Sequence, residues 1–378
     1  MKRCKRGKIL FGSLLVFSFA IILLLYAKLE NTEHEENGLE NINNYSPIAL
    51  LEDTIVYDYF NDDDEFVIGC YDIESKNLSD VICVDGFYIS SGLPAVIEDS
   101  VILPVTLYTN EHKLLMINAD SNTSDTIFND YNSSAIDVVS TMNTAIYMLS
   151  TIRDNSIETS YIRKYNETTN KMDICIKKEF ANNTGEQIIA FACSNERIYV
   201  IVNQIEAEDD IYIEIYDDKN YDLIGKLYFD SELRNDVSEN GIIQFYCFND
   251  YIYVRNFTDY GAIGKIENDQ VKTVLNLYNL RIAYNGRNTQ DNYYGFFLRG
   301  GKDFYILDVD TDILYQTNLG LSQDESFRNV LSNGNDICIC ILDETDTEAF
   351  TTKNTTIVDF NELINEAYQI KPIADYLN

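Results

Sequence analysis

Tryptophan is absent from the 378 residues, and histidine occurs only at His34 and His112. The first absence excludes every repeat motif that contains a tryptophan. The second excludes a histidine-rich zinc site, and the eight cysteines include no Cys-x-x-Cys pair. A Ser-His-Asp triad would depend on His112, which we expect to be an exposed turn residue in YTNEHKLLM.

Basic residues are scarce after residue 28. All 62 acidic residues follow that position, together with 22 of the 28 lysines and arginines, so residues 29–378 carry a formal charge of −40. Nucleic acid and anionic lipid surfaces would repel such a domain, and we expect no nucleic-acid partner. A cationic partner stays open, and a solvated acidic surface is the simpler interpretation.

The N-terminal segment has the pattern of a membrane anchor. Residues 1–8 contain five bases and no acid, and residues 9–27 are uncharged and mostly apolar. Nineteen residues of helix span about 28 Å, close to the roughly 30 Å of a hydrocarbon core. The bases before this run place the N-terminus in the cytoplasm and the C-terminal domain outside, as a single-pass protein of the cell membrane. A cleavable signal peptide is the alternative, although the run ends in Leu25-Tyr26-Ala27 rather than Ala-x-Ala.

Residues 28–45 are polar and acidic and predict a flexible stalk. From residue 46 to 378 the pattern is strand after strand, rich in Ile, Val, Tyr and Phe and bounded by polar turns. Helical periodicity is limited to short pieces at residues 230–237, 322–331 and 361–369.

A polar turn with Asp or Asn, followed by an apolar strand, recurs at intervals of 42 to 54 residues. It occurs at Asp53, Asp99, Asn143, Asn195, Asn249, Asp291 and Asn335. A period of this length with about four strands is typical of a β-propeller blade. A ring of such blades buries both faces of every sheet and leaves only short edges. The sequence therefore predicts an all-β fold, a β-propeller of about seven blades, with tandem β-sandwiches as the alternative.

In this layout the chain resembles bacterial membrane-anchored β-propeller proteins over nearly all of residues 46–378. The WD dipeptide, the aspartate box, the YWTD motif and the double-glycine kelch motif are all missing. The resemblance therefore implies a fold and a surface location, and no activity.

The alternating acids Asp308, Asp310 and Asp312 are the candidate metal ligands, because they resemble the start of a Ca²⁺ loop. An EF-hand loop would need Gly at its sixth position and Glu at its twelfth, where this chain has Ile313 and Leu319. A hairpin turn between YILDV and ILYQT is the competing interpretation. Asp308-x-Asp310 is also similar to the metal-binding acids of membrane glycosyltransferases, but the long helices of those enzymes have no counterpart here.

Two denser acidic runs, residues 61–65 and 206–210, predict exposed loop tips between strands. Of the cysteines, Cys70 and Cys83 are the pair to test. A hairpin turning at residues 75–78 would place them directly opposite each other, at a distance that permits a disulfide.

These patterns contain no catalytic constellation. We therefore expect a binding or scaffold module for a protein, peptide or glycan, held at the membrane by its N-terminal helix. An extracytoplasmic hydrolase or lyase of the propeller type, using carboxylates at the central channel, is the alternative. A third possibility is an accessory ectodomain of a larger membrane complex.

Overall fold

The fold comes from a computed structural model. It describes residues 46–61, 65–84, 86–88, 94–109, 111–130, 135–142, 145–153, 157–169, 171–181, 187–203, 211–283, 293–333, 336–343, 352–359 and 371–372. The predicted tail, anchor and stalk, residues 1–45, lie outside this part of the chain. No helix within it is long and apolar enough to cross a membrane.

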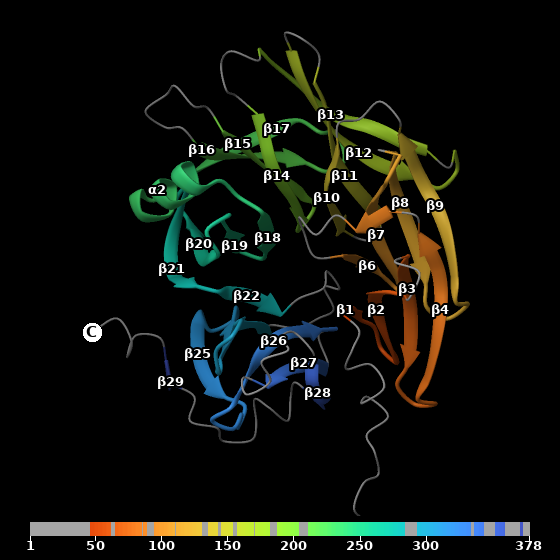
Figure 1. The fold of residues 1–378 in the computed structure, drawn as a ribbon. Coiled ribbons are helices and arrows are strands. Elements are labelled where there is room, and N and C mark those ends of the chain that lie inside the picture. The colour runs from red at the N-terminus through yellow and green to blue at the C-terminus, as the bar shows by residue number, and fades with distance from the viewer. Residues whose placement is uncertain are drawn as a thin grey trace, which may run out of the picture. The chain divides into compact units, whose positions relative to one another are not determined.

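The first half of the domain consists of antiparallel meanders (Figure 1). The first sheet contains β1 (Ser46–Leu50), β2 (Thr54–Phe60), β3 (Phe66–Asp72) and β4 (Asn77–Val84). The second contains β5 (Gly86–Tyr88), β6 (Ala95–Ile97), β7 (Ser100–Leu107), β8 (His112–Asn118) and β9 (Thr123–Asp130). The third contains β10 (Ala135–Met142), β11 (Ala145–Arg153), β12 (Ile157–Asn166) and β13 (Lys171–Ala181).

The second half repeats the pattern and adds a short helix. Two meanders share one eight-stranded sheet, because β17 and β21 pair in parallel. They are β14 (Gln187–Ser194), β15 (Arg197–Asn203), β16 (Ile211–Asp217) and β17 (Leu223–Phe229), then β18 (Gln244–Phe248), β19 (Tyr251–Arg255), β20 (Tyr260–Glu267) and β21 (Gln270–Tyr278). The next sheet contains β22 (Leu280–Ala283), β23 (Tyr293–Leu298), β24 (Asp303–Asp308), β25 (Ile313–Asn318) and β29 (Lys371–Pro372). The last contains β26 (Glu325–Ser332), β27 (Asp336–Asp343) and β28 (Thr352–Asp359).

The recurring polar cue marks the turn between the first two strands of a meander. Asp53 and Asp99 precede β2 and β7, and Asn195 and Asn249 occupy the turns before β15 and β19. Asn195 and Asn249 have φ angles of 51° and 49°, in the left-handed region that asparagine tolerates in tight hairpins. The cue residues Asn143, Asp291 and Asn335 lie outside the described part of the chain.

The core lies between successive meanders. One apolar cluster joins residues of β1–β4 to β6–β8, and further clusters join each later meander to the next, as far as β26 and β27. β26 in turn contacts β1, so the last meander returns to the first. Every sheet therefore buries both faces, as blades arranged in a ring require.

The helix α2 (Ser231–Asn240) connects β17 to β18 and confirms the predicted helical piece at residues 230–237. Asp230 caps it by accepting a hydrogen bond from the Leu233 N–H at 3.0 Å. The same side chain accepts from the Thr273 N–H at 2.6 Å, which ties the helix to β21. Gly241 ends the helix at a φ of 67°.

The helix predicted at residues 322–331 is wrong, because this segment contains β26. A bulge between Phe327 and Asn329 interrupts the alternation of the strand. It leaves Phe327, Val330 and Leu331 buried. That spacing of three and four residues imitates a helical face. The third predicted helix, residues 361–369, lies outside the described residues.

Candidate functional site: an arginine pair beside the turn between β19 and β20

The turn between β19 and β20 is held by Asn256, which is buried. Its Oδ1 atom accepts hydrogen bonds from the Thr258 N–H at 2.9 Å and the Tyr260 N–H at 3.0 Å. Its Nδ2 atom donates to Asp236 of α2 at 2.9 Å. The last turn residue, Asp259, has a φ of 70°, a conformation that aspartate adopts more easily than most residues. The turn thus places the Asp259 carboxylate in a defined position.

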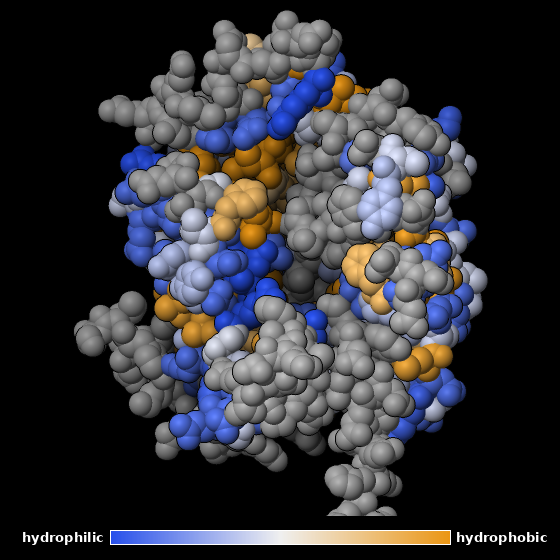
Figure 2. All heavy atoms as spheres, in the orientation of Figure 1, coloured by the Kyte–Doolittle hydropathy of each residue, from blue (hydrophilic) through white to orange (hydrophobic). Residues whose placement is uncertain are grey.

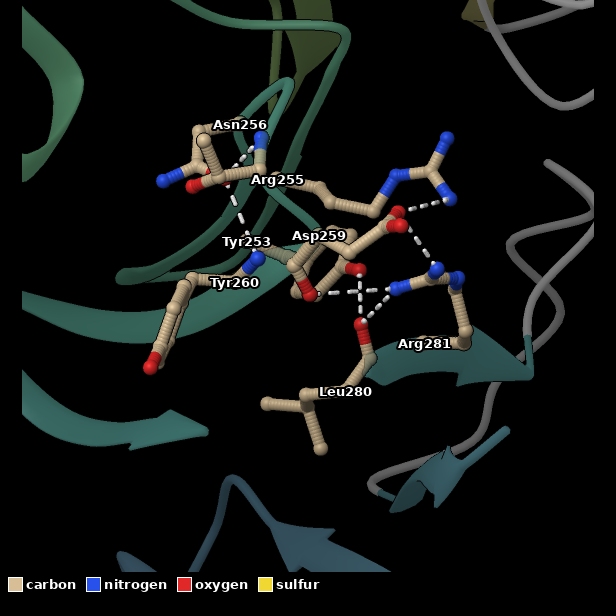
Figure 3. A network of polar contacts seen from close by, with 8 residues as sticks. Tyr253, Arg255, Asn256, Asp259, Tyr260, Leu280 and Arg281 are labelled. Carbon is tan, nitrogen blue, oxygen red and sulfur yellow. Dashed lines mark hydrogen bonds and ion pairs between the residues drawn. The ribbon is translucent and has the colours of Figure 1, made fainter. Parts of the chain in front are cut away.

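Two arginine side chains meet at this carboxylate (Figure 3). The Nη2 atom of Arg281, on β22, lies 2.8 Å from Asp259 Oδ1. The Nη1 atom of Arg255, at the end of β19, lies 3.9 Å from the same oxygen. Arg281 also donates to the carbonyl oxygens of Leu280 at 3.2 Å and Asp259 at 3.4 Å. The Tyr253 hydroxyl donates to the Leu280 carbonyl at 2.8 Å, which fixes the start of β22.

Both guanidinium groups are largely removed from solvent, with side-chain exposures of 12 % for Arg255 and 9 % for Arg281. Burial, and then the positive charge of Arg281, lowers the pKa of Arg255. Arginine nevertheless stays protonated in proteins. Two positive charges therefore share one carboxylate, and the group carries a net charge of +1 within a strongly acidic domain.

The guanidinium group of Arg255 lacks hydrogen-bond acceptors within the described part of the chain. Its distance to Asp259 exceeds that of a hydrogen bond, and its Nε atom is buried without a partner in the described part of the chain. Figure 3 shows both guanidinium groups on the same side of the turn, with the Tyr260 ring pointing away from them. Figure 2 shows a hollow near the middle of the molecule, and hydrophilic side chains gather beside it near the place where Figure 1 shows β22. Guanidinium N–H groups recognise planar anions.

The candidate metal residues lie at the turn between β24 and β25, as the hairpin interpretation predicts: Asp308 ends β24, and Asp310 and Asp312 lie in the turn. Asp308 is buried, and its carboxylate accepts from the Asp310 N–H at 3.0 Å, the Thr311 N–H at 3.2 Å and the Thr311 hydroxyl at 2.7 Å. Asp312 lies 2.6 Å from Lys265 Nζ and accepts from the Tyr251 hydroxyl at 2.9 Å. These two hydrogen bonds lower the pKa of Asp312. Among the described residues, no three His, Cys, Asp or Glu side chains are grouped as they would be around a metal ion.

The two acidic runs are residues 61–65 and 206–210. Asp62, Asp63 and Asp64, and residues 206–210, lie outside the described residues. Asn61 and Glu65, which flank the first run, bond to each other through Nδ2 and Oε2 at 2.9 Å.

The expectation of an exposed turn at His112 is wrong. His112 is the first residue of β8 and is buried, and its Nδ1 atom lies 3.0 Å from Thr106 Oγ1 on β7. The two residues are paired across the strands, so the ring has a hydrogen-bond partner within the sheet.

The predicted contact between Cys70 and Cys83 is also wrong. Cys70 lies opposite Ser79, and Cys83 lies opposite Val67. The reason is the turn, which occupies residues 73–76 instead of 75–78 and closes on a hydrogen bond from the Ser75 N–H to Asp72 Oδ1 at 2.6 Å. Cys70 is buried, Cys83 is exposed, and both are free thiols.

The arginine pair was missed at the sequence level because Arg255 and Arg281 are 26 residues apart and belong to no motif. One signal was present: both bases lie at strand ends in a domain that is short of bases.

No family model and no curated protein matches the chain. Two solved structures are similar in fold. The β-propeller domain of the Trilobed protease from Pyrococcus furiosus, which has an open velcro topology, superposes with a TM-score of 0.52 at 11% identity, over 88% of this chain and 98% of that one. The Pyrococcus horikoshii acylaminoacyl peptidase superposes with a TM-score of 0.51 at 11% identity, over 89% of this chain and 56% of that one. The chain therefore has an all-β fold of the β-propeller class, and at this identity the likeness extends to the fold alone.

Proposed function

We propose that the chain is a membrane-anchored, extracytoplasmic β-propeller that acts as a binding or scaffold module for a protein, peptide or glycan. The observation that carries this proposal is a set of exposed aromatic side chains at one end of the sheets. They are Phe60 (57 % exposed), Tyr108 (60 %), Phe257 (69 %), Tyr260 (42 %) and Tyr278 (55 %).

These aromatic residues share a topological position. Phe60 and Tyr278 end β2 and β21, and Tyr108 follows β7. Phe257 lies in the turn after β19, and Tyr260 directly follows that turn. In an antiparallel meander, the second and fourth strands end on the same side, opposite the turn between the first two strands. In a ring of such meanders these ends form one face, which is also the face of Arg255 and Arg281. Exposed aromatic residues are enriched where proteins bind partners.

We infer seven blades. Each antiparallel meander counts as one blade, and the eight-stranded sheet counts as two. The spacing of the polar cue supports the same number. The three-stranded meander β26–β28 would then be the last blade, in contact with the first.

The membrane part of the proposal rests on residues 1–45. The apolar run at residues 9–27 and the bases before it support a single anchor with the C-terminal domain outside the cytoplasm. Resistance of the protein to alkaline carbonate extraction would support the anchor, and full release of the protein would contradict it.

The alternative is a propeller-type hydrolase or lyase, which would need paired carboxylates or an acid and a base at the channel. At the site described above, the Asp259 carboxylate is engaged in an ion pair with Arg281 at 2.8 Å and lies 3.9 Å from Arg255. This arrangement supports binding rather than acid–base chemistry.

The test compares two double variants of the full chain. Phe257→Ser with Tyr278→Ser removes aromatic surface from the proposed face. Leu223→Ser with Ile224→Ser removes similarly exposed apolar surface (50 % and 53 %) from the start of β17, at the opposite end of the sheets. We expect capture of a membrane-extract partner, or binding to a glycan panel, to be lost in the first variant and kept in the second. Equal loss in both variants, or none in either, would contradict the proposed face.

A further inference from the structure

We propose that Arg255 and Arg281 form a subsite for a single carboxylate group of the ligand. This inference rests on the proposed binding function and deepens it, because it gives one chemical group that the ligand must carry.

The first step is the hydrogen-bonding capacity of the pair. Each guanidinium group has five N–H donors. Arg281 uses donors on the Asp259 carboxylate and on two carbonyl oxygens. Arg255 makes no side-chain hydrogen bond within the described residues, because its Nη1 atom lies 3.9 Å from Asp259 Oδ1. Donors without partners on a largely buried side chain are uncommon in native proteins and call for an acceptor.

The second step is the charge. The group formed by Arg255, Arg281 and Asp259 carries +1, which one monoanion neutralises. The domain as a whole carries −40, which disfavours polyanions such as nucleic acids or highly charged polysaccharides. A carboxylate on an otherwise uncharged ligand satisfies both conditions, and a phosphate dianion satisfies them less well.

The third step is geometry. The guanidinium fork matches the two oxygens of a carboxylate. The Asp259 carboxylate occupies some of the N–H donors of Arg281. The Nη1 atom of Arg255 lies 3.9 Å from Asp259 Oδ1, and Arg255 makes no side-chain hydrogen bond within the described residues. The side chain of Arg255 is therefore the one available for a ligand, and Arg281 supports it by orienting Asp259.

The experiment uses the detergent-solubilised full chain at low ionic strength, with ¹⁵N-labelled arginine. N-acetylglycine provides a peptide-type carboxylate and glucuronate a sugar-type carboxylate. N-acetylglycinamide and methyl glucuronate are the matched uncharged probes, and inorganic phosphate is the competing anion. The readouts are the shift of the arginine Nε–H resonances during titration and the rise in melting temperature that binding to the folded state produces.

We expect at least one carboxylate to bind, the uncharged probes to have no effect, and phosphate to bind more weakly. The stronger carboxylate then indicates whether a peptide or an acidic sugar is the source. Arg255→Gln should lower the affinity about tenfold, and Arg255→Lys should restore part of it, because the charge returns without the fork. Arg153→Gln is the control, since Arg153 pairs with the single carboxylate of Glu158 at 2.8 Å on another meander.

Three results would overturn the subsite: equal effects of charged and uncharged probes, unchanged carboxylate binding in Arg255→Gln, or tighter binding of phosphate than of either carboxylate. The binding function is tested separately by the aromatic variants. If those variants lose the partner while Arg255→Gln binds carboxylate normally, the proposed face stands and the subsite falls.

Discussion

The Nδ2 atom of Asn333 donates a hydrogen bond of 2.9 Å to the carbonyl oxygen of Leu51, a residue 282 positions earlier in the chain. A second bond of the same kind runs from Asn329 to the carbonyl of Pro47 at 3.1 Å. Both connect the last meander to the first. None of the described apolar clusters spans this junction. Side-chain amides therefore contribute to ring closure here, whereas packed apolar side chains join the other meanders.

Replacing Asn333 by alanine should destabilise the domain. Asn333 is buried, and its Oδ1 atom also accepts from the Asp336 N–H at 2.7 Å, so the change removes both hydrogen bonds and takes the Asn333 donor away from the carbonyl of the buried residue Leu51. A buried acceptor that loses its donor costs about 1–3 kcal/mol. Urea denaturation should therefore show a free energy of unfolding lower by about 2 kcal/mol or more. The exposed residue Gln323, on the connection before β26, provides the control variant Gln323→Ala, and an equal loss there would refute a special role for the junction.

A carboxyl group near the same junction should make stability depend on pH. Burial raises the pKa of Asp58, on β2, from 3.8 to about 7, and the positive charge of Arg328 on β26 opposes this increase only in part. The folded state therefore binds the proton more tightly than the unfolded state. Stability from this group is complete below pH 4, falls as the pH rises towards 7 by at most about 1.4 kcal/mol per unit, and then stays level.

Asp58→Asn should remove this slope between pH 4 and 7. Self-repulsion of an acidic protein gives a slope of the same sign, so the change must be compared with Asp222→Asn, which removes one exposed carboxylate. Thermal unfolding of the three proteins across this pH range measures the difference. Parallel profiles for the wild type and Asp58→Asn would show that Asp58 has an ordinary pKa in the folded protein.

The strand rhythm and the fold class could be predicted from the sequence, because alternating β-branched and aromatic residues and the periodic Asp or Asn turns are local signals. The bulge at Phe327 could not be predicted, since it moves buried residues into a helical spacing. The turn after β3 was placed two residues too late, and this error moved the partner of Cys70 from Ser79 to Cys83. A small local error of this kind changes every cross-strand neighbour of a hairpin.

The candidate site depends on a different kind of information. Arg255 and Arg281 meet only because β22, the first strand of the next meander, begins beside the turn that follows β19. No spacing along the chain records that contact. The acids at Asp308, Asp310 and Asp312 were more conspicuous in the sequence, but Asp308 and Asp312 have partners in their own turn or on the neighbouring meander.

Thiol reactivity should distinguish Cys83 from Cys70. Cys83 is exposed, whereas Cys70 is buried and burial raises its pKa to about 11, which leaves little reactive thiolate at neutral pH. Iodoacetamide should alkylate Cys83 in the native protein and Cys70 only after denaturation, as peptide mass spectrometry would show. Cys247, which is also buried, serves as the internal control. A disulfide-linked peptide containing Cys70 and Cys83 would contradict the register of β3 and β4.

The remaining prediction concerns the effect of calcium on the turn between β24 and β25. The Asp308 carboxylate already accepts three hydrogen bonds from its own turn, and Asp312 is paired with Lys265. A hard cation would have to replace these partners and gather six or more oxygen ligands. We therefore expect millimolar Ca²⁺ to leave the melting temperature of the purified chain unchanged.

A rise of several degrees that a chelator reverses would instead show that the turn rearranges around the ion, because only a ligand of the folded state stabilises it. Asp310→Asn then locates the effect, since it removes one carboxylate of the turn without changing the size of the side chain. Loss of the rise in this variant would assign the ion to Asp308, Asp310 and Asp312. Persistence of the rise would direct the search to another acidic loop.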